Sequence, residues 1–169
     1  MPDFDVLVIG AGPAGYVCAI RAAQLGKKTA IVEREWLGGV CLNIGCIPSK
    51  ALLHNAQVAH TLRTGGKELG FTLDGLKLDY AAAVRRSRQV SDRLVKGVGF
   101  LMKKNKIEVL TGTARLEAAG RVAVTGADGA SKSVSAAAVV IASGARPAIL
   151  PGVSVDGQRV VTYREAILQ

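Results

Sequence analysis

The chain has 169 residues, of which 49% are apolar, so it is long enough for one domain with an appendage and can bury a substantial core. Its nearest approach to a membrane span, residues 6–20, is interrupted by glycine and proline, so no spanning helix is predicted. The formal net charge is +9, but much of the excess falls in a segment of helical apolar spacing without interleaved aromatic residues, so we expect no nucleic-acid binding.

The N-terminal part of the chain predicts a strand–helix–strand unit. Residues 4–9 are a continuous apolar run that ends in glycine, which is typical of a buried parallel strand. Residues 13–25 have a helical pattern that Gly26 closes, and residues 28–33 form a second strand. Two strands joined by one helix indicate a right-handed parallel crossover.

The elements that follow are helical at first and then extended. Further helices are expected at 49–62 and 79–104, with a glycine-rich stretch between them. Short segments between glycine turns then predict a small antiparallel meander. The expected strands are 107–110, 113–116, 121–124 and 132–134, followed by a buried strand at 138–142. Residues 145–169 are expected to be irregular apart from, at most, a final helical turn.

The long basic segment at 79–104 predicts an amphipathic helix. Its apolar side chains recur at helical spacing, and they are Val84, Leu94, Val98, Leu101 and Met102. The basic side chains are expected to form a solvated face, and they are Arg85, Arg86, Arg88, Arg93, Lys96, Lys103 and Lys104, with Lys106 just beyond the helix.

A glycine-rich turn directly follows the first strand. Gly10, Gly12 and Gly15 match G-x-G-x-x-G: the first glycine permits a tight turn, the second lets a pyrophosphate approach, and the third lets helix and strand pack closely. Pro13 suits the first helical turn, whose free N–H groups favour an anion. Glu33 ends the second strand, where it can accept hydrogen bonds from an adenosine ribose. The turn predicts a dinucleotide site, for either FAD or NAD.

Cys41 and Cys46 are separated by four residues, a spacing that fits a structural disulfide, half of a metal site or a redox pair. The N-terminus has no readable signal peptide, so we expect a cytoplasmic protein, in which a persistent structural disulfide is disfavoured. The other candidate zinc ligands, His54, His60 and Cys18, include no second cysteine pair, so we expect no metal. We favour the redox pair, and we expect Cys18 to be a small buried hydrophobe and the histidines to have surface or helix-packing roles.

The two cysteines lie in different local surroundings. Gly45 provides the freedom that the link needs if it is to curl and bring the two Cα atoms within disulfide distance. Cys46 lies just ahead of a predicted helix whose dipole favours a thiolate, and Lys50 adds a positive charge on the same side. Cys41 lies nearer the loop. Such an asymmetry is what directional disulfide exchange requires.

Two segments resemble signatures of a known family. GVCLNIGCIPSKALL (residues 39–53) resembles the redox-active signature of the class I flavoprotein disulfide reductases, usually G-T-C-x-N-x-G-C-x-P-S/K-K. VVIASGARPAILPG (residues 139–152) resembles the second flavin-domain signature of the same family; Val40 and Ser143 each replace a usual Thr. The resemblance implies an α/β fold, namely a Rossmann-like FAD-binding domain with a parallel sheet, flanking helices and a small antiparallel β-meander.

The resemblance also implies that the cofactor at the glycine-rich turn is FAD. The residues that it assigns to cofactor binding are Gly10, Gly12, Pro13, Ala14, Gly15, Glu33, Arg34, Gly39, Val40, Cys41, Lys50, Gly112, Ala114, Ser143 and Gly144. The catalytic residues would be Cys41, which exchanges with the substrate disulfide, and Cys46, which contacts the flavin and passes electrons. Lys50 would lie near the reactive edge of the flavin ring.

The segment around the cysteines is most similar to family members that oxidise dihydrolipoamide to lipoamide with NAD as acceptor. Such members imply a role in cell redox homeostasis, a homodimer, and a dihydrolipoamide group carried on an acyltransferase subunit of a 2-oxoacid dehydrogenase complex. Family enzymes are much longer, so we expect residues 1–145 to be the first part of an FAD-binding domain. Residues 146–169 would be a connecting tail toward an NAD-binding domain that this chain lacks, and the chain alone is expected to be inactive.

Two alternatives to this function stay open. One is a non-catalytic module that binds flavin, senses thiols or docks another protein. The other is a different branch of the same family, such as the mercuric or glutathione-type reductases, although their cysteine segments usually differ around residues 47–53. Bound flavin and two thiols that appear on reduction separate the enzyme from the module.

Overall fold

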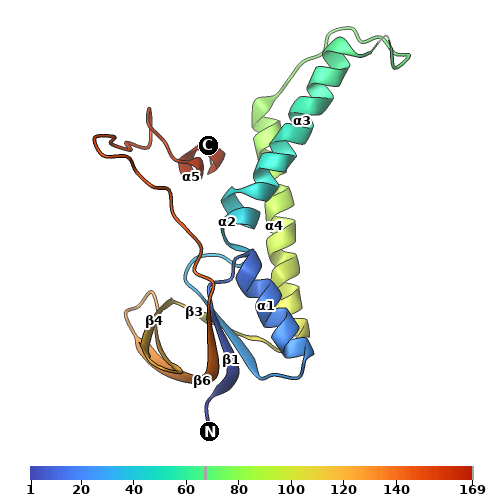
Figure 1. The fold of residues 1–169 in the computed structure, drawn as a ribbon. Helices are drawn as coiled ribbons and strands as arrows, with labels where there is room; N and C mark the ends of the chain where they lie inside the picture. Colours follow the sequence, from blue (N-terminus) through green and yellow to red (C-terminus); the bar gives the residue numbers. More distant parts are fainter. Residues whose placement is uncertain (67, 169) are drawn as a thin grey trace.

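The computed structural model describes residues 1–66 and 68–168, in which one mixed sheet is flanked by helices and a long helical hairpin stands away from it (Figure 1). In chain order the elements are β1 (Phe4–Ile9), α1 (Pro13–Gln24), β2 (Thr29–Glu33), α2 (Gly39–Ile44), α3 (Cys46–Thr64), α4 (Tyr80–Lys104), β3 (Glu108–Thr111), β4 (Thr113–Ala118), β5 (Arg121–Thr125), β6 (Ser131–Ile141) and α5 (Tyr163–Leu168). This arrangement confirms the predicted α/β fold class.

The described strands lie in the order β3-β2-β1-β6-β5-β4. β1 is central, because Val8 is opposite Ile31 of β2 on one side and Val140 of β6 on the other, both in parallel register. β5 pairs antiparallel with β6 on one side and with β4 on the other, and these three strands make the predicted meander. The parallel crossover β1–α1–β2 is therefore confirmed, and its strand ends bring several loops to one edge of the sheet.

The separate strands expected at 132–134 and 138–142 are wrong, because both belong to the single strand β6. No glycine or proline interrupts residues 131–142, so nothing in the sequence stops the strand between its two halves. Its first half pairs antiparallel with β5 and its second half pairs parallel with β1. β6 thus joins the meander and the parallel half into one sheet.

The sheet has a hydrophobic cluster on each face. Leu7 and Val122 are fully buried on the face that the meander closes, while Val8 and Ile31 are fully buried beneath α1 and α4. The end of β6 is less buried than predicted, and Ile141 is 67% exposed. The reason is that α1 packs over β1 and β2 and not over the end of β6 (Figure 1).

α4 is amphipathic as predicted, but its buried face differs from the predicted one. Its buried residues are Ser87, Ser91, Val98 and Met102. Leu94 and Leu101, which were expected in the apolar stripe, are 40% and 37% exposed. Arg88, which was expected on the solvated face, is half-buried and bonds to α2. The predicted burial of Val98 and Met102 is confirmed, whereas that of Leu94 and Leu101 is wrong, because α4 packs against α2 and α3 through a polar stripe that hydrophobic spacing does not reveal.

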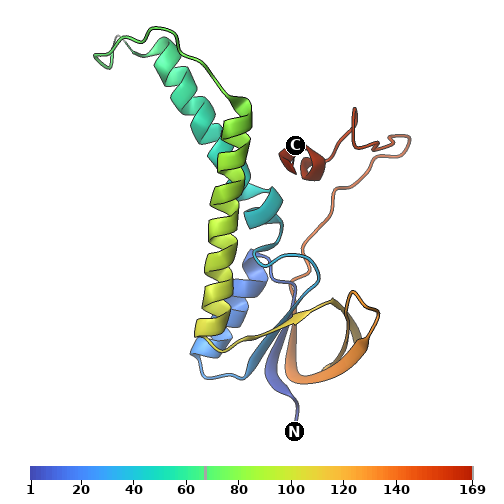
Figure 2. The same ribbon diagram turned by 180° about the vertical axis from the view of Figure 1, so that it is seen from behind.

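The α3–α4 hairpin and the C-terminal arm project from the sheet on the same side (Figures 1 and 2). α4 is capped by Asp79, the residue just before the helix, whose carboxylate accepts a hydrogen bond from the Ala82 N–H at 2.9 Å. The arm, residues 146–162, is irregular and ends in α5, which lies beside α2. Irregular structure is what the sequence predicts there, and residue 169 lies outside the described residues. Within the described ranges, no helix is both long and apolar enough to cross a membrane.

Candidate functional site

The glycine-rich turn links β1 to α1 and brings backbone groups into close contact. Gly10 has a φ of +99°, and a Cβ there would lie 2.4 Å from the Ala142 carbonyl oxygen. A Cβ at Gly15 would lie 1.8 Å from the Gly10 carbonyl oxygen, so the third glycine allows the helix to pack on the turn. A Cβ at Gly12 would meet only the Gly39 Cα, at 4.0 Å, and Gly12 precedes α1, whose first-turn N–H groups are uncapped by a side chain. This end of α1 can therefore receive an anion.

Glu33 ends β2 beside this turn. Its Oε2 accepts a hydrogen bond from the Ala11 N–H, and its Oε1 accepts one from the Glu35 N–H, both at 2.8 Å. The carboxylate thus connects the glycine-rich turn to the loop after β2. Each carboxylate oxygen keeps a further lone pair, so the group can still accept a hydrogen bond from a ligand hydroxyl.

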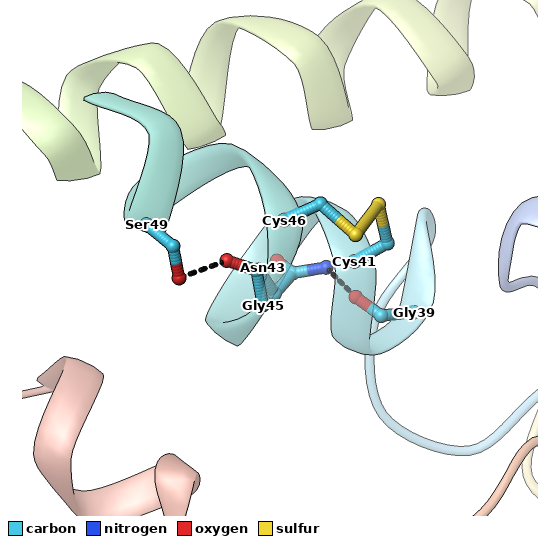
Figure 3. The surroundings of a disulfide bond; sticks show 6 residues. All are labelled: Gly39, Cys41, Asn43, Gly45, Cys46 and Ser49. Carbon is cyan, nitrogen blue, oxygen red and sulfur yellow. Dashed lines mark hydrogen bonds between the residues drawn. A yellow bond between two sulfur atoms is a disulfide. The ribbon is translucent and has the colours of Figure 1, made fainter. Parts of the chain in front are cut away.

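Cys41 and Cys46 form a disulfide at the corner between α2 and α3, with their Cα atoms 4.6 Å apart (Figure 3). Neither α2 nor a helix start at Cys46 was predicted; the helix was expected only from residue 49. Gly45 makes the corner, with φ −134° and ψ −112°, and the Ser49 hydroxyl donates to its carbonyl at 2.6 Å. Cys46 therefore occupies the first position of α3, nearer the positive end of the helix dipole than predicted.

The disulfide-bearing corner touches the glycine-rich turn. Gly38 and Gly39, with φ of +86° and +57°, lead into α2, and a Cβ at Gly39 would lie 2.6 Å from the Gly12 Cα. Cys41 is half-buried and packs against the core beneath α1, whereas Cys46 is exposed. Two separate sequence motifs are thus brought together by backbone contact.

Two polar residues that the sequence analysis did not assign to the site form hydrogen bonds at this corner. The Asn43 side-chain amide donates to the Leu37 carbonyl at 3.0 Å and to the Gly39 carbonyl at 2.9 Å (Figure 3). The Arg88 Nη1 on α4 donates to the Asn43 carbonyl at 2.6 Å. In the sequence, only the position of Asn43 between the two cysteines could have indicated its role. No residue near Arg88 in the sequence indicates that Arg88 contacts the site.

A cleft of about 1180 Å³ runs past the glycine-rich turn, the disulfide and the end of β6. The predicted site residues that line it are Gly10, Gly12, Pro13, Glu33, Arg34, Gly39, Val40, Cys41, Cys46, Ser143 and Gly144. Gly112 and Ala114 line an adjoining hollow of about 370 Å³. Within the described residues, Ala14, Gly15 and Lys50 line neither hollow. Gly15 is buried under the turn, and Lys50 is exposed on α3.

The C-terminal arm supplies a wall of the cleft that sequence reasoning missed. Arg164 of α5 forms an ion pair with Glu35, and its guanidinium lies 4.9 Å from the centre of the Trp36 ring. The Thr162 N–H and hydroxyl both donate to Glu165, and these bonds hold the pKa of that carboxyl below its ordinary value. T-x-x-E is a helix-start pattern, so it could have located α5 but not the residues that α5 meets.

The remaining candidates lie away from the cleft. Cys18 is half-buried and packs against the core beneath α1, so it is less buried than the small buried hydrophobe that was expected. The reason is that α1 is a surface helix whose innermost positions are the smaller Gly15 and Ala19. His54 and His60 are exposed on α3. Over the described part of the chain, no three His, Cys, Asp or Glu side chains gather in a way that could hold a metal ion.

A model of the family described as pyridine nucleotide-disulphide oxidoreductase matches residues 4–169. The chain belongs to this family. Membership implies FAD binding, which fits a cleft that joins a dinucleotide-type glycine turn to a disulfide.

Curated relatives carry the name dihydrolipoyl dehydrogenase. Those from Chlorobaculum parvum, Rhizobium etli and Mycobacterium tuberculosis are 47%, 49% and 49% identical to this chain over 98%, 98% and 99% of its length. The chain spans only 35–37% of the length of these relatives. The crystal structure of LpdA from Mycobacterium tuberculosis is similar over 96% of this chain and 36% of its own, with a TM-score of 0.83 and 26% identity.

Proposed function

We propose that this chain is the FAD-binding, disulfide-carrying part of an enzyme that oxidises dihydrolipoamide to lipoamide. The observation that carries the proposal is the contact between the two motifs: Gly39, at the start of the disulfide helix α2, abuts Gly12 of the dinucleotide turn. Cys41 and Gly12 consequently line one cleft. A redox pair next to a flavin site is the arrangement that disulfide exchange coupled to a flavin needs, and the names of the relatives indicate the substrate.

The shape and chemistry of the cleft fit FAD. Gly12 and Pro13 line the cleft at the N-terminus of α1, where a pyrophosphate would accept hydrogen bonds from backbone N–H groups that no side chain caps. Glu33 stands beside that turn to accept from a ribose hydroxyl, and Gly112 and Ala114 line the adjoining hollow for the adenine. The cleft volume of about 1180 Å³ is somewhat larger than the roughly 300–1,000 Å³ of most ligand sites, as an extended dinucleotide requires.

In this proposal Cys41 and Cys46 take the electrons from the substrate. A substrate thiolate attacks the Cys41 sulfur, the bond between Cys41 and Cys46 breaks, and Cys46 leaves as a thiolate at the N-terminus of α3. The second substrate thiol then displaces Cys41, so the substrate closes to a cyclic disulfide and both cysteines are reduced. Bound FAD supplies the two-electron acceptor that restores the pair, and NAD⁺ is the final acceptor. The dipole of α3 stabilises Cys46 as the leaving group.

The proposal assigns residues 1–145 to the FAD-binding domain and 146–169 to a connector toward an NAD-binding domain. Further cofactor contacts are assigned to residues that line the cleft, namely Gly10, Pro13, Arg34, Val40, Ser143 and Gly144. The family resemblance also assigns Ala14, Gly15 and Lys50, although these three line neither hollow. In the longer protein the substrate would be a lipoyl group on an acyltransferase subunit of a 2-oxoacid dehydrogenase complex. That protein would be a cytoplasmic homodimer.

A thiol count with a flavin spectrum tests this function. The 169-residue chain should show one free thiol, Cys18, and three after reduction, and added FAD should acquire the spectrum of bound flavin. Stoichiometric dihydrolipoamide should release one lipoamide per chain and expose the two thiols. Cys46→Ser should abolish this exchange, whereas Cys18→Ser should not change it. Three free thiols before reduction together with no flavin binding would contradict the proposal and favour an interaction module.

NAD⁺ reduction tests the domain assignment separately. With dihydrolipoamide and NAD⁺ in excess, the chain should stop after one exchange, because the residues that would bind NAD⁺ are assigned beyond the connector. Sustained formation of NADH by the 169-residue chain would overturn that assignment without affecting the exchange at the disulfide.

A further inference from the structure

Arg88 is a half-buried cation behind the disulfide, and the proposed exchange does not use it. It extends from α4 toward the α2–α3 corner, where its Nη1 donates to the Asn43 carbonyl at 2.6 Å. Its Nη2 lies 3.4 Å from the hydroxyl of Ser91, which is 2% exposed. Its Nε is buried and has no hydrogen-bond partner within the described residues. Burying part of a charged guanidinium costs free energy of desolvation, so the position of Arg88 calls for a structural or functional explanation.

The acceptor of the Arg88 bond is one of the last carbonyls of a short helix. α2 ends at Ile44, and Asn43 lies in its final turn, between the two cysteines. Such terminal carbonyls have no partner within their own helix, and a cation there opposes the negative end of the helix dipole. The Asn43 side chain in turn holds Leu37 and Gly39 at the start of α2. Arg88 therefore secures both ends of α2 through one residue.

The disulfide bridges the α2–α3 corner, and Asn43, the residue that Arg88 contacts, lies between its two cysteines. Cys41 lies in α2, Cys46 begins α3, and Gly45 between them has the least restricted backbone of any residue type. Once the sulfur–sulfur bond opens, the corner depends on noncovalent contacts to keep the two Cα atoms at 4.6 Å. The Arg88 bond reaches this corner from α4, 45 residues along the chain from Asn43.

We propose that Arg88 is a positioning residue for the redox pair: its hydrogen bond to Asn43 holds the α2–α3 corner closed when the pair is reduced and so favours re-formation of the disulfide. The inference rests on the proposed function, because it assumes that the pair opens and closes. Without Arg88 the corner gains conformational freedom in the dithiol state, and closure costs more entropy. The dithiol form is then favoured relative to the disulfide.

The equilibrium with glutathione measures this effect. Two glutathione molecules reduce the disulfide, giving two cysteine thiols and one glutathione disulfide, and alkylation followed by mass spectrometry gives the fraction reduced. Arg88→Met should shift the equilibrium constant about tenfold toward the dithiol, which is about 30 mV for a two-electron couple. Arg88→Lys, which keeps the charge but not the forked geometry, should shift it in the same direction by a smaller factor. Arg86→Met, at an exposed position of the same helix, should leave it unchanged.

Unfolding midpoints measured on the same variants separate positioning from general support. A lower midpoint for Arg88→Met with an unchanged glutathione equilibrium would overturn the inference, because Arg88 would then support both redox states equally. A shift toward the disulfide in Arg88→Met would also overturn it. The main effect of Arg88 would then be to stabilise a cysteine thiolate by its charge, and not to hold the α2–α3 corner closed. If Arg88→Met does not fold, Arg88→Lys decides by the same criterion. Failure of the wild-type chain to oxidise dihydrolipoamide contradicts the proposed function alone, since the glutathione equilibrium is still measurable.

Discussion

The β1–α1–β2 unit and the C-terminal arm both line the cleft, but they are held in opposite ways. In the unit, backbone meets backbone: the Gly10 N–H donates to the Val32 carbonyl at 2.8 Å, and the Ala142 N–H donates to the Ile9 carbonyl at 2.8 Å. The arm has no buried residue in α5 and reaches the rest of the chain through the side chain of Arg164. One wall of the cleft is therefore part of the core, and the other is attached to its surface.

Because the two walls are held differently, they should tolerate different amino-acid substitutions. A wall made of packed backbone has no room for an added atom and transmits any strain into the sheet. A wall fastened by an exposed ion pair and a cation–π contact can detach with little effect on global stability. We expect perturbations of the unit to unfold the protein and perturbations of the arm to move it locally.

Gly15→Ala is expected to have the largest effect on the packed wall. The new Cβ would lie 1.8 Å from the Gly10 carbonyl oxygen, so α1 must move off the turn, at a cost of about 3 kcal/mol or more in the free energy of unfolding. Urea denaturation measures it. The control is Gly97→Ala, in mid-helix with open space around it, which should be stabilising by up to about 1 kcal/mol. Equal stabilities of the two variants would remove the distinction between the walls.

Met102→Ala tests the support beneath the same wall. Met102 is 1% exposed and packs with Val8 and Ile31, so its truncation should cost about 2–4 kcal/mol. Its neighbour Leu101 is 37% exposed, and Leu101→Ala should cost about 1 kcal/mol or less. A larger loss from Leu101 in the same denaturation experiment would mean that α4 is rotated relative to the described face.

Arg164→Gln should detach the arm while the fold stays intact. The ion pair with Glu35 is exposed, so the change in global unfolding free energy should stay within about 1 kcal/mol. Trp36 is the only tryptophan of the chain, and its emission should change because the guanidinium over its ring is lost. Arg159→Gln, in the same arm, is the matched control and should leave the emission unaltered. Unchanged Trp36 emission in Arg164→Gln would show that the arm is not fastened there.

The smallest expected effect is a pH dependence of the arm. The Thr162 hydroxyl and N–H lower the pKa of Glu165 from its ordinary value of 4.5. A lowered pKa means that the capping contribution is complete above that ordinary value and is lost as the pH falls through the folded value. Trp36 emission, followed from neutral pH to about pH 3, should therefore change below pH 4.5 in the wild type.

Glu165→Gln should remove the part of the acid change in Trp36 emission that comes from the cap on α5. Glu35→Gln removes the ion pair with Arg164 and so shows how much of the change comes from that contact. An identical acid transition in the wild type and in Glu165→Gln would contradict a capping role for Glu165. The start of α5 would then be stabilised by contacts other than those between Thr162 and Glu165.

Much of the packed wall could be predicted from the sequence because its signals are local. The apolar run at 4–9, the glycine spacing from Gly10 to Gly15, and Glu33 at the end of a strand lie within one short segment. The predicted strand and the observed β1 agree at both ends. The cysteine pair and its position by a helix could also be predicted, although α2 could not, because a six-residue helix carries too little periodicity.

The errors came where distant residues decide the outcome. β6 is one strand because it pairs with both β1 and β5. Neither pairing can be predicted from the hydrophobic spacing along residues 131–141. Leu94 is exposed against expectation, while Ser91 is buried, because α4 packs against α2 and α3 through small polar side chains. Propensity describes a segment alone, whereas burial depends on the neighbours that the fold supplies.

From the sequence alone, the glycine spacing predicted a dinucleotide turn, and the resemblance of two short segments to a known family predicted the α/β fold and a redox pair at Cys41 and Cys46, because both signals depend on residue types at short fixed spacings. Only the tertiary structure decided that the turn and the disulfide touch, that Arg88 holds the corner, and that Arg164 fastens the arm. Asn43 and Arg88 are 45 residues apart, and Glu35 and Arg164 are 129 residues apart. Contacts over such separations follow from how the helices pack on the sheet, and that packing is a property of the whole chain.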